Sequence, residues 1–167
     1  MNTQALFAQL LVGLINGSFY ALLSLGLAVI FGMLNIINFA HGALYMMGAF
    51  AAWFLLNVAG LNYWYALILA PLGVGFVGVI IERTMLQRLA GLDHLYGLLL
   101  TFGLALIIQG LFQNYFGSSG LPYAIPPQLT GAQNLGFMFL PNYRAWVVVF
   151  SLTVCLLPWY LIEKMKL

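Results

Sequence analysis

The stretch LFAQLLVGLINGSFYALLSLGLAVIF, residues 6–31, decides the fold of this chain. It contains no charged residue, and the whole of residues 1–81 holds no Asp, Glu, Lys or Arg. A helix that crosses a lipid bilayer needs about 20 consecutive apolar residues. The stretch has neither the positive n-region nor the short apolar core of a secretory signal peptide. We therefore expect it to form a membrane-spanning helix that the protein retains.

The composition of the whole chain leads to the same class. Of 167 residues, 64% are hydrophobic and 5% are charged, and the mean hydropathy is +1.04. About a quarter of the residues of a typical soluble domain are charged, so the composition of this chain predicts an integral membrane protein. The net charge is +2 without a basic patch, which argues against nucleic acid. A single cysteine, Cys155, excludes a disulfide within the chain, and two distant histidines with one cysteine make no metal site.

Five apolar segments predict an all-α fold, a polytopic transmembrane helix bundle of about five spans, organised as one domain over residues 1–167. Each segment approaches the length that a bilayer requires. The expected spans are residues 6–31, 36–56, 63–84, 95–115 and 143–162. Residues 116–142, between the last two spans, hold four of the six prolines. We expect this segment to be an outer loop with turns or a short hairpin.

The basic residues set the expected orientation, because Lys and Arg concentrate in cytoplasmic loops. Arg83 and Arg88 place the loop between the third and fourth spans in the cytoplasm, and Lys164 and Lys166 place the C-terminus there too. Two spans separate these segments, so both can lie on the same side of the membrane. The N-terminus and residues 116–142 are then expected outside.

Small residues at spacings of three or four predict how the helices pack, because close backbone approach drives helix association in lipid. Such stripes occur in the first and fourth expected spans. The predicted packing residues are Gly13, Gly17, Ala21, Gly97, Thr101 and Ala105. The second stripe continues to Gln109 and Gln113, whose amides need partners at membrane depth.

One polar segment interrupts the apolar pattern. Asn35, Asn38 and His41 recur every three residues, so on a helix they share a face, which Tyr45 extends. Asn disfavours helix interiors, and we expect the backbone to break or reorient here. Irregular backbone at membrane depth either is buried in protein or lines a water-filled cavity. From the residues alone, a substrate route and a simple polar turn between two spans are equally good interpretations.

Several motifs, taken in order, resemble one family of membrane proteins. The most specific is INFAHG at residues 37–42. The supporting motifs are GSFYAL at 17–22, MGA at 47–49, ER at 82–83, LQRL at 86–89, TFGL at 101–104 and NLG at 134–136. Together they resemble permeases of branched-chain amino acid ABC importers, most closely the LivH type, over essentially the whole chain.

The resemblance implies a permease subunit, not an enzyme, that moves branched-chain or similar amino acids across a bacterial inner membrane. It implies a second homologous permease subunit, two cytoplasmic ATPase subunits and a periplasmic substrate-binding protein as partners. The chain has no Gly-x-x-x-x-Gly-Lys-Ser/Thr phosphate loop, so we expect no cofactor in it and ATP use by the partner subunits. The expected substrate pathway comprises Asn16, Asn35, Asn38, His41, Gly42, Tyr45 and Gln109.

The chain departs from this family in length. Members of the family continue past a segment like residues 163–167 into a cytoplasmic coupling loop and further helices. We therefore expect an incomplete ABC importer permease fold, truncated at the C-terminus, that does not perform ATP-driven import alone.

Other functions fit the residues less well. A secondary transporter often keeps an acidic residue within a span, and none lies within the five expected spans except Glu82 at an edge. A structural membrane subunit remains open. The run Gly117-Ser118-Ser119-Gly120 matches an intramembrane serine protease pattern. The expected topology, however, places this run and His94 on opposite sides of the bilayer, whereas proton transfer needs about 3 Å.

The predicted topology can be tested by cysteine labelling at Ser118 and Gln87. We expect a membrane-impermeant reagent added outside to reach position 118 and not position 87, because the arginine-containing loop lies inside. Labelling at position 87 without labelling at position 118 would refute the layout.

Overall fold

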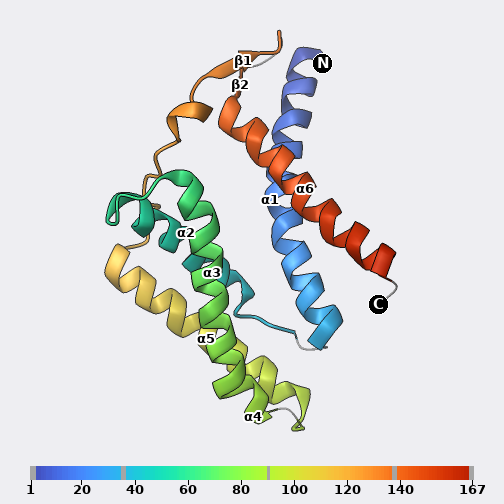
Figure 1. Ribbon diagram of the computed structural model, residues 1–167, viewed down its shortest axis with the longest axis vertical. Coiled ribbons are helices and arrows are strands. Elements are labelled where there is room, and N and C mark those ends of the chain that lie inside the picture. The colour runs from blue at the N-terminus through green and yellow to red at the C-terminus, as the bar shows by residue number, and fades with distance from the viewer. Residues whose placement is uncertain (1–2, 35–36, 90, 137–138, 166–167) are drawn as a thin grey trace. The chain divides into compact units, whose positions relative to one another are not determined.

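The computed structural model describes residues 3–34, 37–89, 91–136 and 139–165. Helices make up most of this part of the chain (Figure 1). In chain order the elements are α1 (Thr3–Leu34), α2 (His41–Asn57), α3 (Tyr63–Ile81), the π-helix η1 (Glu82–Leu86), α4 (Gln87–Leu89), α5 (His94–Phe116), the 3-10 turn η2 (Pro127–Leu129), β1 (Ala132–Asn134), β2 (Phe139–Pro141) and α6 (Asn142–Met165).

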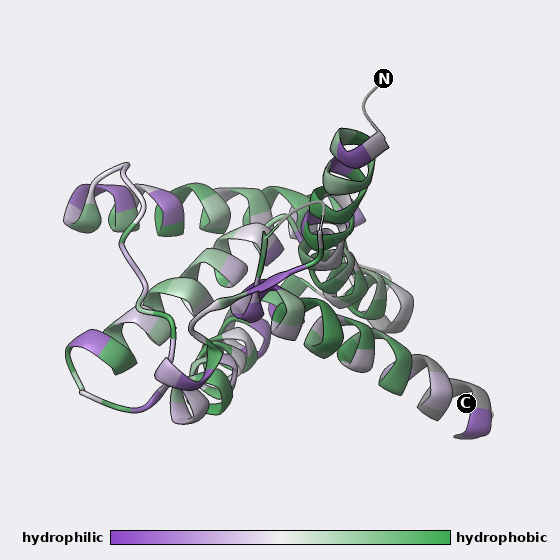
Figure 2. Ribbon diagram, turned by 90° about the horizontal axis from the view of Figure 1, so that it is seen from above, coloured by the Kyte–Doolittle hydropathy of each residue, from purple (hydrophilic) through white to green (hydrophobic). Residues whose placement is uncertain are grey.

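A helix occupies each of the five expected spans, and apolar residues cover most of the helical ribbon (Figure 2). Within the described residues, three helices are long and apolar enough to cross a membrane: Thr3–Gly32, Tyr63–Leu89 and His94–Phe116. The apolar segment Asn142–Pro158 is shorter. The prediction of an all-α, multi-pass membrane protein is confirmed.

The second helix differs from its predicted span. It begins at His41 and not near residue 36, because residues 37–40 are not helical. Its 17 residues extend about 25 Å at 1.5 Å per residue, less than the roughly 30 Å of a bilayer core.

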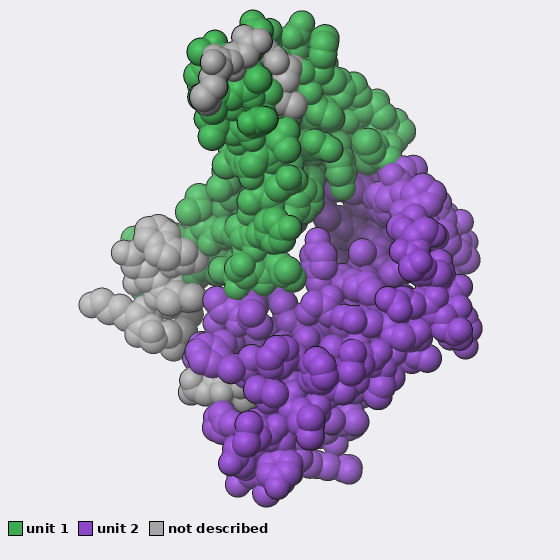
Figure 3. All heavy atoms as spheres, turned by 180° about the vertical axis from the view of Figure 1, so that it is seen from behind, with its two compact units in different colours: residues 1–26, 125–167 green, residues 27–124 purple. Residues whose placement is uncertain are grey.

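The chain divides into two compact units, coloured separately in Figure 3. Unit 1 comprises residues 1–26 and 125–167, and unit 2 comprises residues 27–124. The single domain expected over residues 1–167 stays a prediction.

In unit 1, α1 and α6 are joined by a buried hydrogen bond. The hydroxyl of Ser151 on α6 donates to the backbone oxygen of Ser18 on α1 over 2.8 Å, and Ser151 is 1% exposed. The hydroxyl of Ser18 donates in turn to the oxygen of Ile15. Ile15 and Val147 are buried in the same unit. Hydroxyl groups are satisfied in this way when they lie in apolar surroundings.

The predicted small-residue stripe of α1 does not form this contact. Gly13, Gly17 and Ala21 are exposed, and apart from the adjoining residues and backbone of α1 itself, no atom lies within 4 Å of a methyl group built on either glycine. The described contact between α1 and α6 is instead the hydrogen bond from the hydroxyl of Ser151 to the backbone oxygen of Ser18. A packing role for the stripe stays a prediction.

The expected short hairpin is present between α5 and α6. Strands β1 and β2 pair antiparallel, with Gln133 opposite Leu140. The side-chain amide of Asn142 donates to the oxygen of Thr130 over 3.2 Å, and its backbone N–H donates to the oxygen of Gly131. Gly131 has a φ of +99°, a conformation that favours glycine. Asn142 thereby fixes the hairpin to the first turn of α6.

In unit 2, α2 packs against both α3 and α5. Three alanines, Ala43 on α2 and Ala66 and Ala70 on α3, are nearly inaccessible. Their small side chains allow close helix approach. On α5, Thr101 and Ala105 of the predicted stripe are buried and Gly97 is half-buried.

Aromatic rings fill the other end of this helix pair. Phe50 of α2 lies 4.7 Å from the ring of Phe112 and 4.8 Å from that of Phe116, measured between centroids. In the loop after α5, the ring of Tyr123 lies 6.3 Å from that of Tyr63. Burial, and secondarily the neighbouring Tyr63, raises the pKa of the Tyr123 phenol.

The link between α1 and α6 predicts that Ser151→Ala lowers the free energy of unfolding by about 0.6 kcal/mol, the usual value for such a bond in lipid. Denaturant unfolding of the purified chain in micelles would measure it. Thr153→Ala is the matched control, since the exposed hydroxyl of Thr153 donates only to Val149 of its own helix. Equal effects of the two substitutions would contradict the assignment.

Candidate functional site

The candidate site is the backbone break between α1 and α2. Helix α1 ends at Leu34, and the described residues 37–40 are not helical. Asn38 organises the restart of the helix: its side-chain oxygen accepts a hydrogen bond from the N–H of Ala40 at 2.9 Å. Its backbone oxygen accepts from the N–H of His41 at 3.2 Å. Asparagine favours such local turns because its short amide reaches the backbone two residues on.

A threonine of α5 anchors the break from the opposite side. The N–H of Phe39 donates to the hydroxyl oxygen of Thr101 over 3.2 Å, and that hydroxyl donates to the oxygen of Leu98 over 3.0 Å. Thr101 is 1% exposed. The hydroxyl therefore accepts from the break and donates to its own helix, which satisfies a backbone group that a helix would otherwise have paired.

Apolar contacts surround this anchor. The rings of Phe39 and Phe102 meet edge to face with centroids 6.3 Å apart. Ala40, at the N-cap of α2, is 2% exposed, and Ala43 is 1% exposed. Burial strengthens the hydrogen bond of Thr101, because water does not compete for it.

The structure brings together only some of the predicted pathway residues. Asn38 and His41 are joined through the backbone and both are half-buried. Gly42 is exposed, with open space around it, and Tyr45 is 54% exposed. Asn35 lies outside the described residues.

The face predicted from the three-residue spacing is not formed. That spacing aligns side chains only on a continuous helix, and the non-helical residues 37–40 interrupt it. Of the described residues in that pattern, His41 and Tyr45 share a face, that of α2.

Two further candidates are not among the contacts of the break. Asn16 is exposed on the part of α1 that belongs to unit 1. Gln109 is exposed on α5, eight positions after Thr101. Their part in a substrate pathway stays a prediction.

Sequence reasoning assigned Thr101 to packing and did not identify its hydroxyl as the partner of the break. The feature that could have identified it is that Thr101 is the single hydroxyl residue in the run Leu98–Leu104 of an apolar helix. The break between α1 and α2 has backbone groups that need such a partner. Phe39 was likewise quoted in a motif without a role of its own.

The comparison with known families covers this part of the chain. Residues 9–167 match the family described as branched-chain amino acid transport system / permease component. The chain belongs to this family. The match includes the break, Thr101 and the whole of α5.

Individual relatives carry the same family name. A high-affinity branched-chain amino acid transport system permease protein, BraD of Pseudomonas aeruginosa, is 32% identical over 131 residues, covering 74% of this chain and 42% of the relative. LivH of Escherichia coli K12 is 28% identical over 173 residues, covering 90% of this chain and 54% of the relative. This chain thus spans about half the length of these relatives. No solved structure matches it.

Replacing the anchor provides a test of the site. Thr101→Val keeps the shape of the side chain and removes the acceptor, so the free energy of unfolding should fall by about 1 kcal/mol or more because the N–H of Phe39 loses its partner. Thr101→Ser should retain most of the stability. Denaturant titration in micelles measures both variants.

Thr84→Val is the control for the loss of a threonine hydroxyl, because Thr84 is exposed and its hydroxyl donates to Ile80 of its own helix. The assignment would be wrong if the two valine variants lost the same stability.

Proposed function

We propose that this chain forms part of the permease of an ABC importer that moves branched-chain or similar amino acids. The family match over residues 9–167 carries the proposal. The relatives' names supply the substrate class, and the anchored break supplies a polar, non-helical segment within a set of apolar helices. Such segments occur in transporters where the backbone lines a route for the substrate.

In this proposal the break contributes directly to the substrate route. Asn38 and Thr101 hold the segment in place, and the neighbouring backbone groups and Tyr45 face the route. Asn16, His41, Gly42 and Gln109 are further contributors. The exposed stripe of Gly13, Gly17 and Ala21 then packs against other helices of the assembled transporter.

Partners supply the energy and the ligand. The chain carries no phosphate-loop motif, so ATP is hydrolysed by two cytoplasmic ATPase subunits and no cofactor binds here. A second homologous permease subunit completes the pathway, and a periplasmic binding protein delivers the amino acid. The assembly lies in a bacterial inner membrane, with the N-terminus outside and the C-terminus in the cytoplasm, as Arg83 and Arg88 favour.

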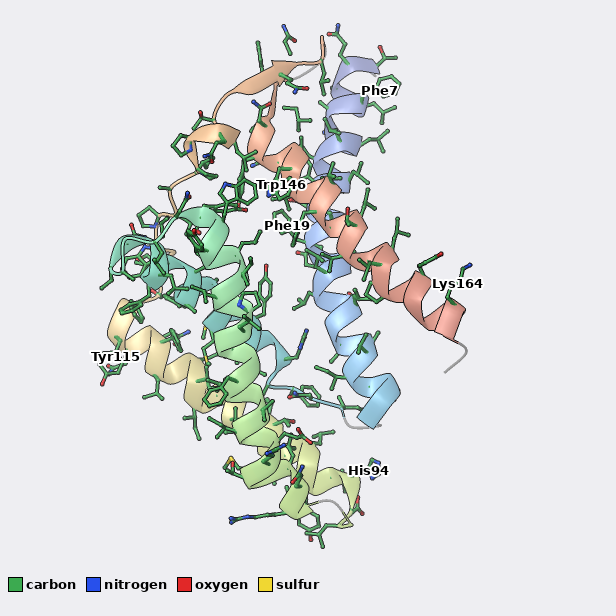
Figure 4. All side chains as sticks on the ribbon, in the orientation of Figure 1. Phe7, Phe19, His94, Tyr115, Trp146 and Lys164 are labelled. Carbon is green, nitrogen blue, oxygen red and sulfur yellow. The ribbon has the colours of Figure 1, made fainter. Side chains whose placement is uncertain are left out.

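An intramembrane protease is disfavoured by the length of α5. Its 23 residues separate His94 from the serines at 118 and 119 by roughly 34 Å at 1.5 Å per residue. Figure 4 shows His94 and Tyr115 at opposite ends of this helix. Proton transfer between a serine and His94 is not possible over that distance, and the family places the chain among transport components.

A chimera tests the proposed function. Residues 9–167 would replace the matching region of LivH from Escherichia coli, and uptake of radiolabelled leucine, isoleucine and valine would be measured in cells that lack LivH. We expect ATP-dependent uptake, because the substituted segment supplies the same part of the permease. Insertion of the chimera without uptake, while LivH restores it, would contradict the proposal.

Within an active chimera, Asn38→Leu should reduce uptake at least tenfold while membrane insertion survives, because the turn that starts α2 loses its acceptor. Asn57→Leu is the matched control: Asn57 also hydrogen-bonds the backbone, at the far end of α2, through its contact with Trp53. If Asn38→Leu transports as well as Asn57→Leu, the break has only a structural role.

A further inference from the structure

The end of α3 offers a possible binding site that does not depend on the transport proposal. The apolar helix Tyr63–Leu89 has 27 residues, which extend about 40 Å. A bilayer core is roughly 30 Å thick and is crossed by about 20 residues. Counted from Tyr63, the core ends near Glu82. Arg83 and Arg88 then lie at the depth of the lipid headgroups.

The π-helical turn η1 changes which side chains are neighbours in this segment. The N–H of Gln87 donates to the oxygen of Glu82, five residues earlier. The side chains of the same two residues also meet, with the Gln87 amide 3.4 Å from a carboxylate oxygen of Glu82. Residues five apart therefore face the same side here. Arg83, in η1, and Arg88, in α4, are likewise five residues apart across this turn, a spacing at which side chains on a regular α-helix diverge.

Both nearby carboxylates have other partners. Glu82 accepts from Gln87, and Asp93 accepts from the N–H of Leu95 at the start of α5 over 3.0 Å. Arg83 and Arg88 are exposed, and neither forms an ion pair within residues 37–89 and 91–136. Among the described residues, both arginines thus lack an internal anion.

The adjacent helix surface is apolar and exposed. Val79, Ile80 and Met85 retain 46%, 45% and 39% of their accessible surface. Acyl chains fit such a surface, and a phosphate group fits the forked donors of arginine. Two arginines next to an exposed apolar surface match a phospholipid, which has both a phosphate and acyl chains, better than they match a soluble anion.

We propose that Arg83 and Arg88 together bind the headgroup phosphate of one anionic phospholipid at the end of α3. The π-turn sets the register that lets both guanidinium groups reach it. The site requires neither transport activity nor a partner subunit, so it can be tested on the chain by itself.

Native mass spectrometry of the chain released from micelles would measure binding of phosphatidylglycerol, with phosphatidylcholine as the zwitterionic comparison. We expect phosphatidylglycerol to bind more tightly, and the double substitution Arg83→Gln with Arg88→Gln to weaken it about thirtyfold. Arg144→Gln on α6 should leave binding unchanged. Each single substitution, made separately, provides the same test if the double variant does not insert.

Two further variants test the geometry. Arg83→Lys with Arg88→Lys keeps the charge and should still weaken binding, since lysine lacks the forked donors. Arg88→Gln with Met85→Arg keeps the number of arginines but moves the second one to another side of the helix, and should bind as weakly as Arg88→Gln alone.

The proposal would be overturned by full binding of the double glutamine variant, by equal loss in Arg144→Gln, or by full binding of the variant with the relocated arginine. Inorganic phosphate provides the last check. Displacement of phosphatidylglycerol by millimolar phosphate would identify a site for a free anion and exclude the lipid site.

Discussion

The hydroxyl of Thr101 meets a requirement that the membrane imposes on the segment between α1 and α2. A backbone N–H in apolar surroundings needs a partner, because no water is present to accept from it. At the break the chain leaves the helix that would have provided one. Thr101 accepts from Phe39 and donates to Leu98, and Asn38 serves the next two N–H groups. A non-helical segment can therefore persist between two apolar helices.

Other features of unit 2 follow from this anchor. The break shortens α2 to 17 residues and places its buried start, at Ala40 and Ala43, against the neighbouring helices. Near the middle of α2, the ring of Phe50 contacts the rings of Phe112 and Phe116 on α5. Thus α2 is attached to α5 at two places, by the hydrogen bond of Phe39 just before its start and by these aromatic contacts. The break is therefore held in a fixed position, as the proposed substrate route requires.

Much of the fold could be predicted from sequence, because apolar length and charge placement are strong signals. The run without charges in residues 1–81 and the prolines of the loop before α6 indicated helices and a hairpin where the structure has them. It was harder to predict which face of each helix makes contacts. Glycine spacing indicated Gly13 and Gly17 as contacts of α1, whereas the hydrogen bond to α6 is made at Ser18, since small size allows close approach but does not select a partner.

The position of the candidate site in the chain could be predicted from sequence, but its contacts could not. Asn38 and His41 marked the segment because polar residues are rare in apolar runs. Periodicity then suggested a shared helical face, which the break removes. The contact between Phe39 and Thr101 joins residues 62 positions apart, and no local pattern encodes a pairing over that separation. The π-turn after α3 could not be predicted from sequence either, because its residues are also common in regular α-helices.

Hydrogen exchange of the Phe39 amide in the unmodified chain tests the central claim most directly. It can be followed residue by residue in lipid nanodiscs, with the exposed loop amide of Gly120 as the fast reference and the helical amide of Leu44, bonded to Ala40, as the slow one. The account predicts that Phe39 exchanges at a rate close to that of Leu44, because Thr101 holds its N–H. Exchange of Phe39 as fast as that of Gly120 would show that the break is not anchored to α5.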